Sequence, residues 1–291
     1  MKPAVFEYRR PATVADALAD LALADGARVL AGGQSLVPLM SLRTTSPPVV
    51  VDINRVEGLG ELAERDGRVH IGATVRMADV LGSRIAQEQL PLVVTALARV
   101  AHPQVRTRGT VVGNLCHHDP ASEMPAVAVA LEAEFTVVSP DGSTTTVPAA
   151  DFFLDSFAVA VPAGGLVTGV SFPVAAPGTG AGLYEITRKA KDFALIASAA
   201  QLTVADGVVT DARVAVSGLT HAPVRMTATE QALTGAFPTL DVLRDAARSA
   251  VGEVLADVNT RSPAGYRARV LPVVVVRALK AAAAAALEGP A

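Results

Sequence analysis

Hydrophobic and polar positions follow a mixed strand and helix pattern near the start of the chain. Residues 6–9 alternate like a short strand, and residues 14–24 carry apolar side chains at helical spacing behind Thr13, a residue type that caps helices. Near-continuous apolar runs at 28–31 and 49–53 are typical of strands buried in a parallel sheet. This order predicts a small β-α-β unit.

The pattern changes from about residue 59, where short alternating segments separated by turn residues take over. Asp66 and Gly67 stand between two such segments, which predicts a hairpin whose second strand lies at 69–72. Thr74 is expected to cap the next helix. The elements predicted after the hairpin are helices at 76–81, 90–101 and 125–132 and strands at 135–138, 144–147 and 166–172.

Residues 173–182 read PVAAPGTGAG, a stretch without periodicity that marks the best domain boundary. The elements predicted beyond it are strands at 183–187, 194–204 and 208–216 and helices near 227–234, 239–256 and 263–286. Strands followed by helices favour an α+β domain, with an antiparallel sheet under a helical layer. The chain is therefore expected to hold one domain at 1–175 and a second at 180–291.

Composition excludes several classes of protein. The chain has 291 residues and a formal net charge of −3, which gives no electrostatic case for binding nucleic acid. Pro272, Arg277 and Lys280 interrupt the longest apolar stretch, so no transmembrane segment is expected, and the first residues lack a signal-peptide core, so a cytoplasmic location is expected. With Cys116 as its single cysteine, the chain cannot hold an iron–sulfur cluster on four thiolates.

Candidate chemistry gathers in residues 102–125, HPQVRTRGTVVGNLCHHDPASEMP. Gly109 and Gly113 allow sharp turns and close approach of the backbone to a ligand, and Thr110 and Asn114 add short polar side chains. Such turns direct N–H groups into a common concavity that binds phosphate. A second glycine loop, AGGQSL at 31–36, follows an apolar run about eighty positions earlier. The two loops could clamp one pyrophosphate.

Other interpretations of these motifs remain open or are excluded by the residues. The loop at 31–36 is neither a P-loop nor a Rossmann fingerprint, and Ser35 is not in a nucleophile elbow. This loop alone fits a plain strand-to-helix turn as well as it fits a phosphate-binding loop. Arg106 and Arg108 are expected to have partly structural and partly phosphate-binding roles, and the sequence does not say which arginine has which role. The adjacent residues His117, His118 and Asp119 project in different directions, so no metal site is expected there, and Asp119 is expected to cap the turn before Pro120.

AGGQSL at 31–36, TVVGN at 110–114 and DPASE at 119–123 resemble the FAD-binding medium subunit of the xanthine dehydrogenase and carbon monoxide dehydrogenase family of molybdenum hydroxylases. The resemblance runs from Phe6 to about residue 280. It implies an α+β chain with a two-subdomain FAD-binding fold of the PCMH or vanillyl-alcohol-oxidase type. The subdomains are expected at about 1–57 and 58–175, followed by the C-terminal domain of antiparallel sheet plus helices.

The resemblance also implies which residues contact FAD. Glu123 matches an acidic residue that accepts hydrogen bonds from the ribose, and Tyr184 is expected either against the isoalloxazine ring or in the core. Glu185 stands where the family often has a lysine, which Lys189 or Lys191 could replace. Val112 stands where the family often has glycine, so its side chain has to point away from the phosphates, or the loop has to open slightly. The implied contact residues are Leu30, Ala31, Gly32, Gly33, Gln34, Ser35, Leu36, His102, Thr110, Val112, Gly113, Asn114, Glu123, Leu166, Tyr184 and Glu185.

By resemblance, the chain is an FAD-carrying electron-transfer subunit without catalytic side chains or metal of its own. A large partner subunit would carry a molybdenum–pterin cofactor, and a small one [2Fe–2S] clusters that feed electrons through FAD to an external acceptor, in a dimer of heterotrimers. The alternatives are a self-contained FAD-dependent oxidase or reductase of the same fold and a non-catalytic nucleotide-binding module. Few polar clusters follow Asp192, which disfavours a self-contained substrate pocket.

Overall fold

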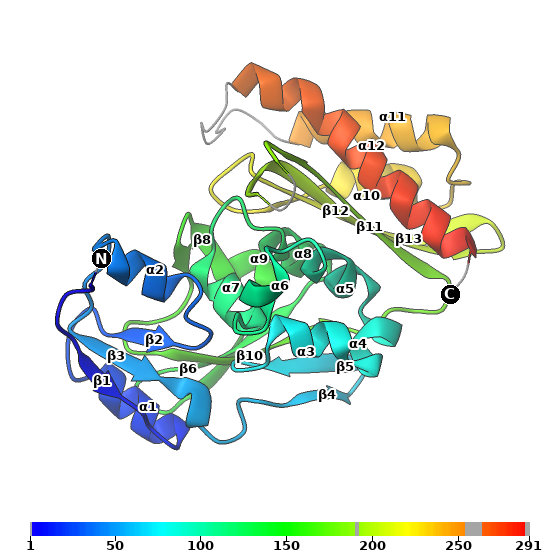
Figure 1. Ribbon diagram of the computed structural model, residues 1–291. Coiled ribbons are helices and arrows are strands. Elements are labelled where there is room, and N and C mark those ends of the chain that lie inside the picture. The colour runs from blue at the N-terminus through cyan, green and yellow to red at the C-terminus, as the bar shows by residue number, and fades with distance from the viewer. Residues whose placement is uncertain (1, 190–191, 254–263, 289–291) are drawn as a thin grey trace.

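A small parallel sheet forms the N-terminal subdomain of the computed structural model, which describes residues 2–189, 192–253 and 264–288. Its strands pair in the order β1-β3-β2 and its two helices lie on opposite faces (Figure 1). Thr13 caps the first helix by accepting the N–H of Asp16 at 3.1 Å, so the expected β-α-β unit and its cap are confirmed. The elements are β1 (Glu7–Arg9), α1 (Val14–Leu21), β2 (Arg28–Leu30), α2 (Leu36–Ser41) and β3 (Val49–Asp52).

An antiparallel sheet of five strands, in the order β4-β5-β10-β6-β7, forms the second subdomain. The expected hairpin at Asp66 and Gly67 joins its first two strands. Short helices pack over this sheet on the side of the C-terminal domain (Figure 1). The elements are β4 (Leu62–Arg65), β5 (Arg68–Gly72), α3 (Met77–Gly82), α4 (Arg84–Gln89), α5 (Pro91–Leu97), α6 (Pro103–Arg106), α7 (Val111–His117), α8 (Met124–Ala130), β6 (Glu134–Val138), β7 (Thr144–Pro148), α9 (Ala149–Phe152), β8 (Phe153–Asp155), β9 (Ala158–Val159) and β10 (Leu166–Pro173).

Two local expectations in this subdomain are wrong. Thr74 does not cap α3, because the helix begins at Met77 with Arg76 at the cap position and without a side-chain cap. The second glycine loop, expected at 110–114, is not a loop throughout, because α7 begins at Val111. Thr110 caps α7 by accepting the N–H of Gly113 at 3.1 Å, and the apolar residues after it turn into the core.

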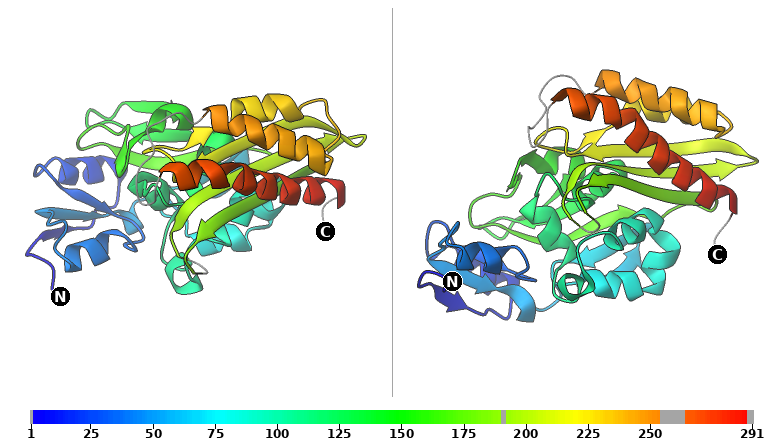
Figure 2. Two further views of the ribbon diagram at one scale, coloured as in Figure 1. Left: turned by 90° about the horizontal axis from the view of Figure 1, so that it is seen from above. Right: turned by 45° about the horizontal axis from the view of Figure 1, so that its top comes forward.

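The C-terminal domain is an antiparallel sheet covered by helices on its outer face, as expected (Figure 2). Its first strand begins at Thr179, four residues before the expected start at 183. The ends of the helices predicted at 239–256 and 263–286 fall partly outside the described residues. The elements are β11 (Thr179–Thr187), β12 (Ala194–Ala205), β13 (Val208–Ser217), β14 (Val224–Arg225), α10 (Thr227–Leu233), α11 (Leu240–Glu253) and α12 (Ala264–Glu288).

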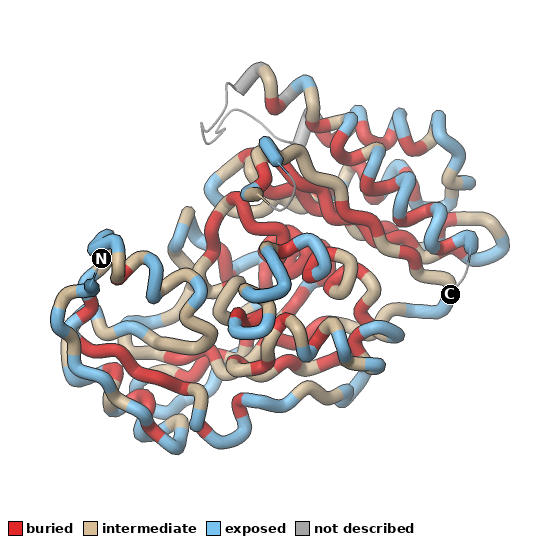
Figure 3. Tube along the Cα trace, in the orientation of Figure 1, coloured by how far each residue is buried: buried red, intermediate tan, exposed pale blue. Residues whose placement is uncertain are grey.

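Both faces of the C-terminal sheet are buried (Figure 3). On one face α12 approaches β11 so closely that a Cβ on Gly182 would lie 2.1 Å from the carbonyl oxygen of Ala278. The opposite face packs on α5 and α8, where Leu183 joins the core of the second subdomain. Although Arg269–Glu288 is long and apolar enough by length and composition to cross a membrane, its buried residues are part of the core against this sheet.

Candidate functional site

The first glycine loop leaves a row of backbone donors unpaired. It connects β2 to α2, and Gly33 has φ +72°, a conformation that favours glycine. Ser35 occupies the N-cap position of α2 without a side-chain cap. Within the described chain, the N–H groups of residues 33–36 donate no hydrogen bond. They are therefore available to oxygen atoms of a ligand.

The two glycine loops, which the sequence predicts could clamp one ligand, touch each other in the structure. A Cβ on Gly32 would lie 2.4 Å from the carbonyl oxygen of Arg108 and 2.7 Å from Cα of Gly109. Neither backbone atom can move aside as the end of a flexible side chain could. Glycine is therefore required at position 32 by packing between the two loops, whether or not a ligand is present.

A cavity of about 330 Å³ opens beside this contact. Arg108 contributes a positive charge to its wall, and Asp52 contributes a carboxylate. Burial alone would raise the pKa of Asp52, but hydrogen bonds from Tyr8 and Asn54 hold it below its usual value. The carboxylate is thus charged but already partnered. The lining residues are Leu30, Ala31, Gly32, Gly33, Gln34, Val37, Pro38, Asp52, Asn54 and Arg108.

The predicted loop at 110–114 contributes mainly the start of a helix. Thr110 and the N–H of Gly113 bond each other in the cap, and a Cβ on Gly113 would lie only 2.5 Å from the Thr110 hydroxyl oxygen. Val112 is buried in the core, so its side chain points away from the cavity without opening the loop. Asn114 accepts a hydrogen bond from the hydroxyl of Ser122 at 3.0 Å.

The structure separates the two arginines whose roles the sequence left undivided. The guanidinium of Arg106 donates to the carbonyl oxygens of Val100 and Ala101 at 2.9 and 3.0 Å, so it holds the turn before α6. Arg108 lines the cavity instead. Only Arg108 therefore places its charge at the first glycine loop.

Glu123 and Glu185 lie at the interface between the second subdomain and the C-terminal sheet. Glu123 is 8% exposed, and burial, then the negative charges of Glu185 and Asp119, raises its pKa to about 7. Oε2 of Glu185 is buried and has no hydrogen-bond partner in the described chain. Burial raises the pKa of Glu185 too, and the charge of Arg99 partly opposes this. This region therefore holds two buried carboxyl groups, one of which, Glu185, has an oxygen without a donor among the described residues.

Tyr184 does not join Glu185 on that face of the sheet. Successive residues of a strand point to opposite faces of a sheet. Leu183 packs with the second subdomain, whereas Tyr184 packs with the core under α12. There its hydroxyl accepts a hydrogen bond from Arg277, whose guanidinium carbon lies 4.7 Å from the ring centroid. Tyr184 is thus a core residue, one of the two roles that the sequence left open.

The other predicted residues have distinct positions. His102 is exposed and begins α6, and its carbonyl oxygen accepts the N–H of Val105 at 2.9 Å. Leu166 is buried at the start of β10, opposite Val138. Lys189 is exposed, and Lys191 lies outside the described residues.

His118 and Asp119 have structural roles of the kind the sequence predicts. His118 Nδ1 lies 2.7 Å from the carbonyl oxygen of Asp155, so Nδ1 donates and joins α7 to the β8–β9 hairpin. Burial lowers the pKa of His118. Asp119 Oδ1 accepts the N–H of Ala121 at 2.9 Å, which confirms its place in the turn at Pro120. Among the described residues, no three His, Cys, Asp or Glu side chains form a group that could hold a metal ion.

Sequence reasoning missed three polar residues beside the cavity, Asp52, Asn54 and Arg76. Asp52 and Asn54 follow directly after a buried parallel strand, and ligands commonly bind at the carboxyl ends of such strands, so a signal was present. Arg76 belongs to the other subdomain, and its link to the cavity is made through Asn54. No local pattern in the sequence marks it.

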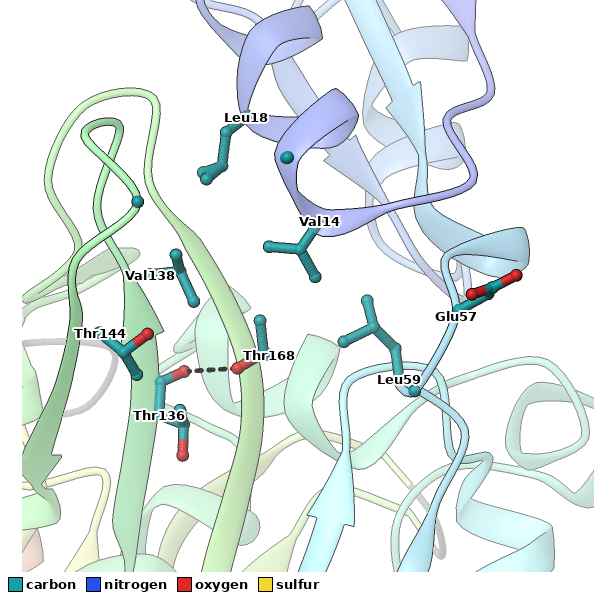
Figure 4. A pocket seen from close by; sticks show the side chains of 11 residues that line it. Val14, Leu18, Glu57, Leu59, Thr136, Val138, Thr144 and Thr168 are labelled. Atoms are coloured by element: carbon teal, nitrogen blue, oxygen red, sulfur yellow. Dashed lines mark hydrogen bonds between the residues drawn. The ribbon is translucent and has the colours of Figure 1, made fainter.

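A second cavity, of about 520 Å³, lies between α1 and the five-stranded sheet (Figure 4). Val14 and Leu18 face Val138 and Leu59 across it. Its polar side chains are threonines and Glu57, and none of the described residues that line it is positively charged. The smaller cavity is therefore the better site for an anionic ligand.

Comparisons with known proteins show which family the chain belongs to. The family model for the FAD binding domain in molybdopterin dehydrogenase matches residues 4–175, and that for the CO dehydrogenase flavoprotein C-terminal domain matches residues 183–282. The chain is 34% identical over 283 residues to the carbon monoxide dehydrogenase medium chain of Hydrogenophaga pseudoflava, which covers 97% of this chain and 98% of that protein. It is 35% identical to the 6-hydroxypseudooxynicotine dehydrogenase complex subunit alpha of Paenarthrobacter nicotinovorans, over 96% of this chain and 95% of that protein.

A solved structure shares the whole fold. A carbon monoxide dehydrogenase from Hydrogenophaga pseudoflava, lacking the Mo-pyranopterin moiety of its molybdenum cofactor, superposes with a TM-score of 0.91 and 36% identity, covering 98% of this chain and 99% of that one. The expected α+β class, an FAD-binding domain followed by a domain of antiparallel sheet and helices, is confirmed. The chain belongs to the FAD-binding medium subunits of the CO dehydrogenase and xanthine dehydrogenase type of molybdenum hydroxylases, and is a subunit of a molybdenum-containing dehydrogenase complex.

Proposed function

We propose that this chain carries FAD without a covalent bond and passes electrons from [2Fe–2S] clusters of a small partner subunit to an external acceptor. Substrate hydroxylation would take place on a large partner subunit with a molybdenum–pterin cofactor, in a dimer of heterotrimers. The observation that carries the proposal is the cradle formed by the two glycine loops. It combines free N–H groups, the charge of Arg108 and a glycine with no room for a side chain.

The residues present fit a dinucleotide. The N–H groups of residues 33–36 and the guanidinium of Arg108 would bind the pyrophosphate oxygens. The carboxyl group of Glu123, which accepts no hydrogen bond from another described residue, would accept hydroxyl donors of the ribose. When bound, FAD supplies the redox chemistry, and these side chains hold and orient it.

Cys116 and His102, two side chains in the segment of the second glycine loop, are both poorly placed to form a covalent bond to the flavin. Burial raises the pKa of Cys116 to about 12, so the thiol stays protonated and is a poor nucleophile at neutral pH. His102 lies exposed at the start of α6 rather than in the lining of the cavity.

Acid denaturation tests the first half of the proposal. The purified full-length chain, loaded with FAD, is precipitated with acid and the absorbance of the supernatant is measured. We expect the yellow chromophore in the supernatant. Colour that stays with the precipitate, or a chain that takes up no flavin, would contradict non-covalent FAD binding.

The second half is tested by adding substrates and partner subunits. We expect the isolated FAD-loaded chain to hydroxylate no heterocycle or aldehyde and to keep its visible flavin band when these are added without oxygen. Addition of the molybdenum and iron–sulfur subunits should give substrate-dependent bleaching. Bleaching in the isolated chain would instead favour the alternative, a self-contained FAD-dependent oxidase or reductase.

A further inference from the structure

Hydrogen bonds around the cradle converge on a side chain that does not line the cavity, Arg76. Arg76 precedes α3 in the second subdomain. One terminal nitrogen of its guanidinium donates to the carbonyl oxygen of Arg108 at 2.7 Å. The other terminal nitrogen donates to Oδ1 of Asn54 at 2.5 Å. Arg76 therefore joins two segments that come from different subdomains.

Asn54 extends this link to the first glycine loop. Its Nδ2 donates to the carbonyl oxygen of Ala31 at 2.8 Å, immediately before Gly32. Asn54 is itself fixed by Asp52, whose Oδ1 accepts the Asn54 N–H at 2.9 Å, and the other carboxylate oxygen of Asp52 accepts the hydroxyl of Tyr8. A continuous chain of hydrogen bonds thus runs from Arg76 to the loop that presents the free N–H groups.

The other end of the link lies at the contact between the loops. The Arg108 carbonyl oxygen that Arg76 binds is the atom that a Cβ on Gly32 would meet at 2.4 Å. The position of this carbonyl decides how closely the loops approach. A single guanidinium therefore fixes both walls of the cavity, one through Asn54 and one through Arg108.

We propose that Arg76 is a positioning residue for the dinucleotide cradle, whose planar fork sets the distance between the two glycine loops. The inference rests on the proposed function in taking FAD as the ligand. A guanidinium has donors at fixed directions, whereas a lysine ammonium is a point charge on a flexible stem. Arg76→Lys keeps the positive charge near the cavity but cannot hold both acceptors in the same geometry.

The test compares Arg76→Lys with the matched control Arg68→Lys in the full-length chain. The side chain of Arg68 makes three hydrogen bonds, against two for Arg76, to Ser171 Oγ at 2.9 Å and to the carbonyl oxygens of Ser171 and Glu132 at 3.1 Å, but it lies away from the cradle. Affinity is measured by calorimetry for FAD and for ADP, which contains the pyrophosphate but no flavin. Thermal unfolding of the ligand-free chain reports any loss of stability.

We expect Arg76→Lys to weaken FAD and ADP binding by a similar factor of about ten, equivalent to about 1.4 kcal/mol. Arg68→Lys should leave both affinities within about twofold of the wild-type values, a difference well under 1.4 kcal/mol, even where it lowers the unfolding temperature. Affinities of Arg76→Lys equal to the wild-type values would overturn the inference. So would weaker binding of FAD alone, because the cradle would then not be the part affected.

A second variant covers the case in which Arg76→Lys does not fold. Asn54→Asp keeps an acceptor for Arg76 but removes the donor to the Ala31 carbonyl oxygen and adds charge beside Asp52. The expected result is again parallel weakening for both ligands, and unchanged affinities would reject the positioning role. A wild-type chain that binds neither FAD nor ADP would overturn the proposed function itself, which a failure of the variants alone would not do.

Discussion

The two ends of the predicted FAD site differ in the polar groups that they leave unpaired. At the cradle these groups are donors, the backbone N–H groups of residues 33–36, beside Arg108. At the interface with the C-terminal sheet the unpaired group is an acceptor, Oε2 of Glu185, beside the buried carboxyl group of Glu123. Donors suit phosphate oxygens, whereas acceptors suit hydroxyl and N–H groups. A dinucleotide offers both kinds of group, which a phosphate ion or a simple sugar does not.

The two regions also differ in the free energy that it costs the protein to leave these polar groups without partners. Backbone N–H groups at the start of a helix have no partner within the helix itself, so the cradle needs little beyond its geometry. A buried carboxylate costs free energy, and the molecule responds by raising the pKa of Glu123 to about 7. Ligand binding at the cradle should therefore be sensitive to added side-chain atoms, and the stability contributed by the carboxyl region should depend on pH.

The largest effect is expected from Gly32→Val. A Cβ at this position would collide with the backbone of Arg108 and Gly109, and neither can yield without separating the loops. We expect complete loss of bound flavin, measured as visible absorbance per chain after purification. Gly82→Ala is the control, because a Cβ at the end of α3 meets nothing within 4 Å. Full flavin content in Gly32→Val would contradict the close contact between the loops.

A smaller effect is expected from the titration of Glu123. It should change the free energy of unfolding of the FAD-free chain by roughly 3 kcal/mol between low and neutral pH. Its pKa is about 7 in the folded chain against 4.5 in the reference state, so the folded chain holds the proton more tightly. The stabilisation is complete below the lower value and is lost as pH rises from about 4.5 to about 7.

Urea denaturation at several pH values between these limits measures this contribution. Glu123→Gln cannot titrate, so the decrease attributed to Glu123 should be missing from its profile. Glu57→Gln, which removes an exposed carboxyl group, should follow the wild-type profile. Identical pH profiles for wild type and Glu123→Gln would show that Glu123 titrates at the same pH in both states of the chain.

The smallest effect is expected from Glu185→Gln. The charge of Glu185 is one of the causes that raise the pKa of Glu123, although burial is the larger one. Removing this charge should move the pH range in which Glu123 loses its stabilising contribution toward lower pH. The same urea denaturation series measures this change in the pH profile. The double variant Glu123→Gln, Glu185→Gln should lack the decrease in stability that is attributed to Glu123. If the decrease in stability attributed to Glu123 moved to higher pH in Glu185→Gln, the result would contradict the repulsion between the two carboxyl groups.

Features set by short stretches of sequence could be predicted because their causes are local. Thr13 caps α1, the turn at Asp66 and Gly67 joins two strands, and AGGQSL forms a strand-to-helix turn with Gly33 at positive φ. In each case one turn or one hydrophobic period decides the conformation. The structure of residues 102–125 is harder to predict from sequence, because the glycines indicate a loop whereas Thr110 can cap a helix.

The sequence by itself determined the two glycine loops, the order of elements and the family pattern. Only the tertiary structure decided that Arg76 bridges the loops through Asn54, that Gly32 packs on the Arg108 carbonyl, and that Tyr184 faces α12 while Glu185 faces the other way. Both faces of β11 are covered, so alternation of polar and apolar residues could not tell which face meets the FAD-binding domain. Contacts between distant segments depend on how the layers pack, and no local stretch of sequence contains that information.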